Sequence, residues 1–321
     1  MALLSRGELP NWQKNGLRYY RLNYFFQEFF GHRVWKVTLD AGFHCPNRDG
    51  TIGTGGCAFC NMESFSPNKT WNVRLDSLRE QLDYGIEVLS RTYTARKFLA
   101  YFQPATNTYA PVEELRRFYT EALDHPQICG LIVGTRPDCV GDDVLDLLAE
   151  LAEKTWVSLE LGVQSIFDRS LERIHRGHTY ADSEDAFRRA KQRGLNLCAH
   201  VVLGLPGETP DDFNATAEAL AKWDLQAVKI HNLYVPYNTE LAGWYREGNV
   251  YLPTLDEYVG WVCDFLERTP KTCVIDRLSG NLPVQYLIAP EWCLNRDLVH
   301  RCVVAELEQR GTVQGERVAL P

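Results

Sequence analysis

The segment VWKVTLDAGFHCPNRDGTIGTGGCAFC, residues 34–60, joins an apolar run to a loop that carries three cysteines. The run Val34–Asp40 is mostly apolar, which is typical of a parallel strand covered on both faces. Cys45, Cys57 and Cys60 follow this run, with eleven and two residues between them. The eleven intervening residues include four glycines, one proline and one asparagine. We therefore expect the loop to fold back and bring Cys45 beside the other two cysteines.

The same kind of apolar run recurs along the chain. Further strands are predicted at Phe98–Phe102, Gly130–Gly134, Val157–Gly162, Leu197–Gly204 and Ala227–Leu233. Amphipathic stretches between them predict helices at Leu75–Ser90, Pro111–Leu123, Asp142–Glu153, Tyr180–Arg193 and Pro210–Lys222. Six strand–helix units in succession imply a parallel barrel or a doubly wound sheet. Because six units fall short of a closed eight-stranded barrel, we predict an α/β fold with a partial (βα)6 TIM-like barrel and its sites at the C-terminal strand ends.

The alternation of strands and helices ends after Pro236. Beyond it, helices are predicted at Leu255–Arg268 and Asp297–Gln309, and a short seventh strand at Cys273–Asp276. We therefore predict a barrel core over residues 1–235, with an N-terminal helical segment, and a mainly helical extension over residues 236–321 that packs on it.

The composition is that of a globular protein. Of 321 residues, 45% are hydrophobic and 24% are charged, and the formal net charge is −8. An acidic chain is not a general polyanion binder, so contact with nucleic acid would need a local basic patch. No apolar run approaches the ~20 residues of a membrane helix, and the first residues lack the apolar core of a signal peptide. We expect a cytoplasmic protein with no membrane partner.

The three clustered cysteines are the strongest chemical signal. Seven others, of ten in total, are scattered and are expected to be small buried hydrophobes, Cys293 included. Cys45, Cys57 and Cys60 are compatible with a zinc site completed by His44 or His32, or with a 4Fe-4S cluster whose fourth iron stays open. The spacing alone does not decide between them. The position after the first barrel strand, and the absence of a second pair of ligands in the sequence, favour the cluster.

The motifs along the chain resemble the radical S-adenosylmethionine (radical SAM) superfamily. The similarity is to the group related to the catalytic subunit of the elongator complex, in particular its short bacterial type (YhcC/YtqA-like) without an acetyltransferase domain. It covers roughly residues 30–320. The eleven-residue spacing is longer than usual for the superfamily but is a feature of this short type. The motifs that carry the resemblance are Asp40–Gly50, Gly55–Cys60, Tyr101–Pro111, Thr135–Asp138, Glu160–Ser165, Arg176–Thr179 and Gly204–Glu208.

The resemblance implies a 4Fe-4S cluster on the three cysteines and S-adenosyl-L-methionine (SAM) on the fourth iron. Reductive cleavage of SAM would give methionine and a 5′-deoxyadenosyl radical, with an electron donor such as flavodoxin or ferredoxin. Phe59 precedes the last cysteine, where the superfamily usually has an aromatic residue that packs against adenine. Gly204 belongs to a motif that resembles the superfamily's strand-five signature, which approaches the adenine.

Polar residues at the predicted strand ends are further candidates for SAM binding. Gln103, Thr106 and Asn107 follow the second strand and offer acceptors to the methionine ammonium. Arg136 follows the third strand with Asp138 and is expected either to clamp a carboxylate or to pair with Asp138 across two loops. Two residues at the fourth strand are candidates for the ribose hydroxyls or the carboxylate: Glu160 and Gln164.

Basic residues beyond the fourth strand are candidates for an anionic substrate. Arg173, His175, Arg176 and His178 form one cluster, for which a solvated helix end is the alternative. His200 lies in the apolar fifth strand and is either a core histidine or a group for radical quenching or proton transfer. Lys229 and His231 alternate on the sixth strand and would share a face, where Lys229 would reach a substrate phosphate or remain a paired structural lysine.

The resemblance implies a tRNA substrate modified at the wobble uridine, without acetyl transfer. A basic segment near the N-terminus, interleaved with aromatic residues, supports RNA contact, although an amphipathic helix at the base of the barrel is the alternative. Two other functions stay open: a radical SAM enzyme for a small metabolite or peptide, and a zinc-stabilised binding protein without catalysis. The segment's residues are Lys14, Arg18, Tyr19, Tyr20, Arg21, Tyr24, Phe25, Phe26, Arg33 and Lys36.

Overall fold

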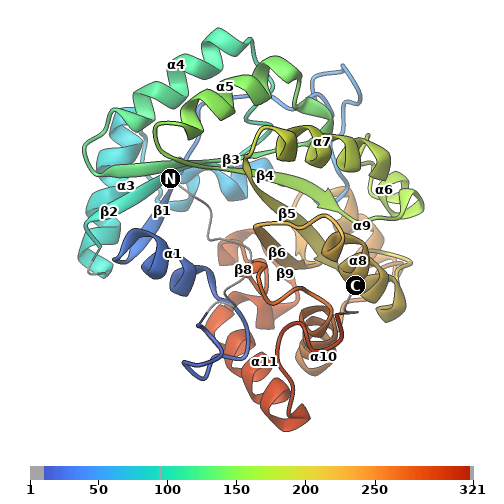
Figure 1. Cartoon of the computed structure of the whole chain (residues 1–321). Coiled ribbons are helices and arrows are strands. Elements are labelled where there is room, and N and C mark those ends of the chain that lie inside the picture. Colours follow the sequence, from blue (N-terminus) through green and yellow to red (C-terminus); the bar gives the residue numbers. More distant parts are fainter. Residues whose placement is uncertain (1–10, 94, 319–321) are drawn as a thin grey trace. The chain divides into compact units, whose positions relative to one another are not determined.

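Strands and helices alternate along the chain in the computed structural model, which describes residues 11–93 and 95–318 (Figure 1). The described residues form two compact units. The first unit contains Phe26–Val163 and His175–Cys198, and the second contains residues 11–25, 164–174 and 199–318. Residues 1–10, on which the expectation of no signal peptide partly rests, lie outside the described residues.

The first unit is built on parallel strands in chain order. Their apolar side chains are buried, as the mostly apolar runs predicted: Val37, Phe98 and Leu131 have no exposed surface. Leu39 pairs with Phe102, and Gly134 pairs with Glu160, so the C-terminal ends of neighbouring strands lie at one edge. The strands are β1 (Val34–Leu39), β2 (Lys97–Phe102), β3 (Ile128–Thr135), β4 (Trp156–Gln164) and the start of β5 (Asn196–Leu203).

Helices lie on the outside of these strands, and two of them begin with a capping box (Figure 1). The Ser77 side chain accepts the backbone N–H of Glu80 while the Glu80 carboxylate accepts that of Ser77, a capping box that fixes the helix start. Thr179 and Asp182 form the same motif at a later helix. The helices are α2 (Pro67–Thr70), α3 (Leu78–Thr92), α4 (Val112–Leu123), α5 (Asp142–Ala152) and α7 (Tyr180–Gln192).

The second unit contains the rest of β5 and two further parallel strands. Strand β6 (Ala227–Asn232) pairs with β8 (Val274–Arg277), and α10 (Leu255–Glu267) packs on α11 (Arg296–Arg310). An antiparallel pair joins β7 (Val235–Pro236) to β9 (Leu287–Ala289). Its other helices are α6 (Asp168–Arg173), α8 (Pro210–Ala221) and α9 (Glu240–Arg246). Helix α1 (Leu22–Phe30) begins in this unit and ends in the first.

The predicted strands and helices are confirmed, with bounds that differ by at most three residues. The short seventh strand and both C-terminal helices are present as β8, α10 and α11. The sequence analysis did not identify α6, α9 or the pair β7–β9, because these elements are too short to show a period. The units do not follow the boundary predicted at residue 235, and that boundary stays a prediction. None of the described helices is long and apolar enough to cross a membrane.

Candidate metal centre

The loop that follows β1 is folded back by its own backbone, as its glycines predicted. The carbonyl of Cys45 accepts N–H groups from Arg48 (2.8 Å) and Asp49 (3.1 Å), and the amide of Gly56 donates to the carbonyl of Asn47 at 2.7 Å. Gly56 has φ +75°, and a Cβ there would lie 2.6 Å from the Arg48 Nε. Only glycine therefore fits this position beside Cys57.

Three guanidinium groups surround the cysteines. The Arg176 Nη1 donates to the Cys57 sulfur at 3.4 Å, and the Arg48 Nη2 donates to the Cys60 carbonyl at 2.7 Å. Arg136 is buried, and its charge interacts with Cys57 and Cys45. It pairs bidentately with Asp138, at 2.9 and 2.8 Å, so this arginine and aspartate join within one short turn rather than across two loops. The centre therefore has a surplus of positive charge.

The sulfurs lie near enough to influence one another. Burial, with the charge of Cys57 as the second cause and that of Cys45 as a minor one, raises the pKa of Cys60 to about 11, while Arg48 opposes the shift. A thiol with this pKa is protonated at neutral pH. Because thiolates are the ligands of iron and zinc, metal binding at this loop must release that proton.

Two histidines were considered as a fourth ligand that would complete a zinc site. His32 is exposed just before β1, and the cysteine loop follows the other end of this strand, about 20 Å away for six residues. His44 is also exposed. The structure therefore separates His32 from the cysteine loop, and His44 remains the histidine beside Cys45.

Three buried polar atoms beside the loop have no hydrogen-bond partner among the described residues. They are the Thr106 Oγ1, the Asn107 Oδ1 and the Arg136 Nη1. The Thr106 amide donates to the His44 carbonyl at 3.3 Å, and the Asn107 Nδ2 donates to the Gly134 carbonyl at 2.7 Å, so both residues are fixed between the cysteine loop and β3. Unsatisfied buried polar groups are costly, so these three atoms are available to hydrogen-bond a polar ligand.

Three further predicted site residues belong to the first unit. The Gln103 Oε1 lies 3.4 Å from the Thr38 hydroxyl, a weak contact that leaves the oxygen available. Glu160 is buried, and its Oε1 accepts from the Lys36 Nζ at 3.0 Å. Phe59, which stands between Cys57 and Cys60 in the sequence, is half-buried. Their roles stay predictions, and the Lys36 partnership is one that the sequence did not indicate.

The Arg176–His178 segment is turned inward rather than forming a solvated helix end. Arg176 and His178 are both buried, and the Arg176 Nη2 donates to the Gly162 carbonyl at 2.8 Å. The Arg176 Nε donates to the His178 Nε2 at 2.9 Å. Burial, followed by the charge of Arg176, lowers the pKa of His178 to about 4, so the imidazole is neutral at neutral pH. The predicted contact of these two residues with a substrate is untested.

Other predicted site residues belong to the second unit. Gln164 has φ +69° at the end of β4, a conformation that costs free energy and is common at functional sites. Gly204 has φ +96°. The rings of His200 and His231 are tilted by 36° with centroids 5.7 Å apart, and Lys229 is buried on the same strand as His231. Their roles toward a cofactor or substrate stay predictions.

Four of the five aromatic residues predicted to support RNA contact in the N-terminal segment are buried, and the fifth, Tyr24, is half-buried. Tyr19, Tyr20, Phe25 and Phe26 are buried, and the last of these packs edge-on against Trp156 in the first unit. These aromatic side chains serve the protein core because their apolar area is removed from water. The amphipathic helix that the sequence offered as the alternative is present as α1.

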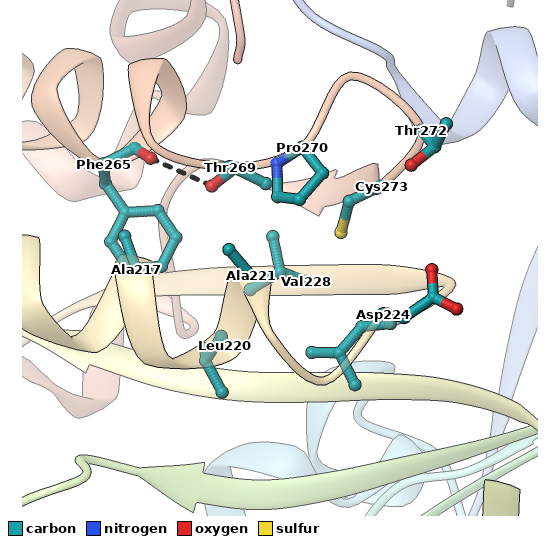
Figure 2. A pocket seen from close by; sticks show the side chains of 11 residues that line it. Ala217, Leu220, Ala221, Asp224, Val228, Phe265, Thr269, Pro270, Thr272 and Cys273 are labelled. Carbon is teal, nitrogen blue, oxygen red and sulfur yellow. Dashed lines mark hydrogen bonds between the residues drawn. The ribbon is translucent and has the colours of Figure 1, made fainter. Parts of the chain in front are cut away.

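A separate pocket in the second unit contains none of the predicted site residues. It lies between α8, β6 and the segment after α10, and its lining is mainly apolar (Figure 2). The Thr269 hydroxyl on its wall donates to the Phe265 carbonyl at 2.9 Å (Figure 2). Burial raises the pKa of Cys273 to about 12, which keeps this thiol protonated.

Comparison with known proteins identifies relatives over most of the chain. Residues 48–220 match the model of the Radical SAM superfamily, and residues 225–309 match that of the Radical_SAM C-terminal domain. The Bacillus subtilis protein YtqA is 39% identical over 302 residues, which cover 93% of this chain and 92% of that protein.

Two further proteins are similar to this chain at lower sequence identity. The tRNA uridine(34) acetyltransferase of Methanocaldococcus jannaschii is 28% identical over 181 residues, 55% of this chain but 32% of that enzyme. The solved structure of Methanocaldococcus infernus Elp3 superposes with a TM-score of 0.67 at 19% identity, covering 88% of this chain and 64% of the other. The shared fold confirms the predicted partial barrel class.

Proposed function

This chain belongs to the radical SAM superfamily, and on that basis we propose that it is an enzyme in which Cys45, Cys57 and Cys60 hold a 4Fe-4S cluster. When bound, the cluster would pass one electron to SAM on its fourth iron, and cleavage of the sulfonium C–S bond would give methionine and a 5′-deoxyadenosyl radical. The observation that carries the proposal is a buried cation at the sulfurs: Arg176 is 8% exposed and contacts Cys57.

The charge of the centre supports an anionic occupant. The partners of Arg176 are the Cys57 sulfur, the Gly162 carbonyl and the His178 ring, and no described carboxylate lies within salt-bridge distance of it. A buried charge without an opposite charge is strongly unfavourable. A cluster with three thiolate ligands carries net negative charge, so it would satisfy the charges of Arg176 and Arg48, whereas Arg136 is already paired with Asp138.

The partnerless polar atoms fit the amino-acid end of SAM. The Thr106 Oγ1 and the Asn107 Oδ1 are acceptors for the methionine ammonium, with Gln103 as a third acceptor. The Arg136 Nη1 is a donor for the carboxylate, and Asp138 holds this guanidinium in place. The remaining contacts are proposed from the superfamily resemblance: adenine against Phe59 and Gly204, and ribose or carboxylate at Glu160 and Gln164.

Anaerobic reconstitution tests this core chemistry. We expect the purified chain to bind four irons and four sulfides and, with dithionite or reduced flavodoxin or ferredoxin, to convert SAM into 5′-deoxyadenosine. Asn107→Ala should weaken SAM binding while keeping the iron, because Asn107 contacts no cysteine. The control Asn196→Ala removes an amide that bonds only to the Val157 carbonyl, at 2.7 Å, and should leave SAM binding unchanged. A colourless protein that takes up one zinc ion per chain would refute the proposal.

For the substrate we propose tRNA, at the wobble uridine. Support comes from the matched segment of a relative whose name is tRNA uridine(34) acetyltransferase. Nucleosides from tRNA of a deletion strain, measured by mass spectrometry, should lack or accumulate one uridine derivative, and the wild-type gene but not Cys57→Ser should restore it. If no tRNA nucleoside changes while 5′-deoxyadenosine is formed, the substrate is not tRNA, and a small metabolite or peptide becomes the next candidate.

A further inference from the structure

Two side chains direct N–H groups at the same cysteine sulfur. The Arg176 Nη1 lies 3.4 Å from the Cys57 Sγ, and the Asn47 Nδ2 lies 3.6 Å from it. Both residues are buried, Asn47 with 5% of its surface exposed. Because N–H···S contacts are longer than N–H···O bonds, these distances are those of hydrogen bonds to sulfur.

Both donors are held in place by other bonds. The Arg176 fork is fixed at its two other nitrogens, since Nε donates to the His178 Nε2 at 2.9 Å and Nη2 donates to the Gly162 carbonyl at 2.8 Å. His178 can accept this bond because its Nδ1 carries the proton and donates to the Thr179 carbonyl at 3.0 Å. The Asn47 Nδ2 also donates to the His175 carbonyl, at 2.6 Å.

We propose that Arg176 and Asn47 set the reduction potential of the cluster by hydrogen bonding to the Cys57 sulfur. The inference rests on the proposed function, since it concerns the cluster held there. Reduction adds one negative charge to the cluster and its sulfurs. N–H donors and a nearby cation stabilise the reduced form more than the oxidised form, and the potential rises. Arg176 and Asn47 are therefore positioning residues that tune the electron transfer.

The two donors should differ in strength. Arg176 brings a full positive charge with its hydrogen bond, and charge-assisted bonds are about twice as strong as neutral ones. Asn47 brings a neutral dipole. Removal of Arg176 should therefore shift the potential further than removal of Asn47, and Lys at position 176 should restore part of the shift because it keeps the charge but not the fork.

An electron paramagnetic resonance titration of the reconstituted protein measures this potential directly. For Arg176→Gln, we expect the ratio of reduced to oxidised cluster at a fixed potential to fall about tenfold, which is about 59 mV for one electron. Asn47→Ala should lower the ratio by a smaller factor, and Arg176→Lys should lie between Arg176→Gln and the wild type. The control Arg193→Gln removes a guanidinium of the same unit that pairs with Asp146, and it should titrate like the wild type.

The outcomes separate the inference from the proposed function. If the Arg176 and Asn47 variants keep four irons and titrate at the wild-type potential, the inference is wrong while the cluster stands. If the wild type assembles no cluster, both fail. Should the Arg176 variants lose the cluster, wild-type protein with ¹⁵N-labelled arginine decides by electron–nuclear double resonance. A ¹⁵N coupling to the reduced cluster that persists in Arg48→Lys and in Arg136→Lys comes from Arg176 and supports the hydrogen bond. A coupling that is lost in either variant, or no coupling at all, refutes it.

Discussion

Replacement of Gly177 by alanine tests whether the segment after α6 positions the cysteine loop. Gly177 has φ +72°, and a Cβ there would lie 2.7 Å from the Ile52 Cγ2 and 3.2 Å from the Asn47 Oδ1. Gly194 provides a matched control in the same unit, because its φ is +71° and a Cβ there would meet no atom within 4 Å. Both substitutions therefore introduce the same backbone strain, and only Gly177→Ala adds a clash with the loop.

The magnitudes follow from these two terms. The left-handed conformation costs an alanine roughly 1–2 kcal/mol, so the free energy of unfolding of both variants should decrease by this amount. Overpacking costs about 1–3 kcal/mol more, and we expect the lower end for Gly177→Ala because Ile52 is 45% exposed and its side chain can yield. Urea unfolding of the metal-free protein should therefore show Gly177→Ala to be less stable than Gly194→Ala by ~1 kcal/mol. Iron content after reconstitution should fall for Gly177→Ala alone.

A second substitution locates the clash. Ile52→Ala removes the Cγ2 that an alanine at 177 would strike, so the double variant should recover ~1 kcal/mol relative to the sum of the single changes. Equal losses of stability for Gly177→Ala and Gly194→Ala, or an additive double variant, would refute the claim that this segment packs on the cysteine loop.

Three further perturbations have definite expected outcomes. Cys57→Ser should reduce bound iron to background while Cys302→Ser retains it; iron in Cys57→Ser would exclude that ligand. The fold lowers the pKa of His178 from its ordinary value of 6.5 to about 4. Between pH 6.5 and pH 4 the unfolded chain therefore binds more protons than the folded chain, and the free energy of unfolding decreases as the pH falls. Unfolding free energies at pH 7 and pH 5 should show that His178→Gln loses about 2 kcal/mol less than the wild type on acidification; an equal loss would contradict a neutral buried ring. Lys36→Met removes the cation 3.0 Å from the buried Glu160 and should cost ~3 kcal/mol, whereas Lys36→Arg should cost less; a neutral Lys36→Met would show that the pair contributes nothing.

The strands and helices were predictable because the pattern of apolar and polar residues along the chain is regular. Runs such as Phe98–Phe102 and Gly130–Gly134 are buried on both faces, so almost every residue in them is apolar. Helix starts such as Thr209–Asp212 carry the capping residues in the sequence itself. The pair β7–β9 was not predictable, because strands of two and three residues have no period and are held by a pairing between residues more than fifty positions apart.

The sequence predicted the candidate metal ligands of the site, but not the charged groups that surround them. Cys45, Cys57 and Cys60 could be identified from the sequence because closely spaced cysteines are a common pattern of metal ligands. The sequence does not show whether Arg176 faces solvent or a sulfur, since that depends on the path of the chain after α6. The sequence analysis offered it as a substrate anchor or part of a solvated helix end, whereas the structure buries it against Cys57. The ion pair between Lys36 and Glu160 likewise joins strands far apart in sequence.

The long spacing between the first two cysteines is best understood as part of the centre. Each doubling of a flexible loop costs only about 0.6 kcal/mol of closure entropy, and each net backbone hydrogen bond returns about 1 kcal/mol. The loop makes several such bonds, among them Ile52 N–H to the Pro46 carbonyl at 2.8 Å and Gly56 N–H to the Asn47 carbonyl at 2.7 Å. The extra length of the loop therefore costs little free energy. The loop places Asn47 at the Cys57 sulfur and Arg48 at the Cys60 carbonyl.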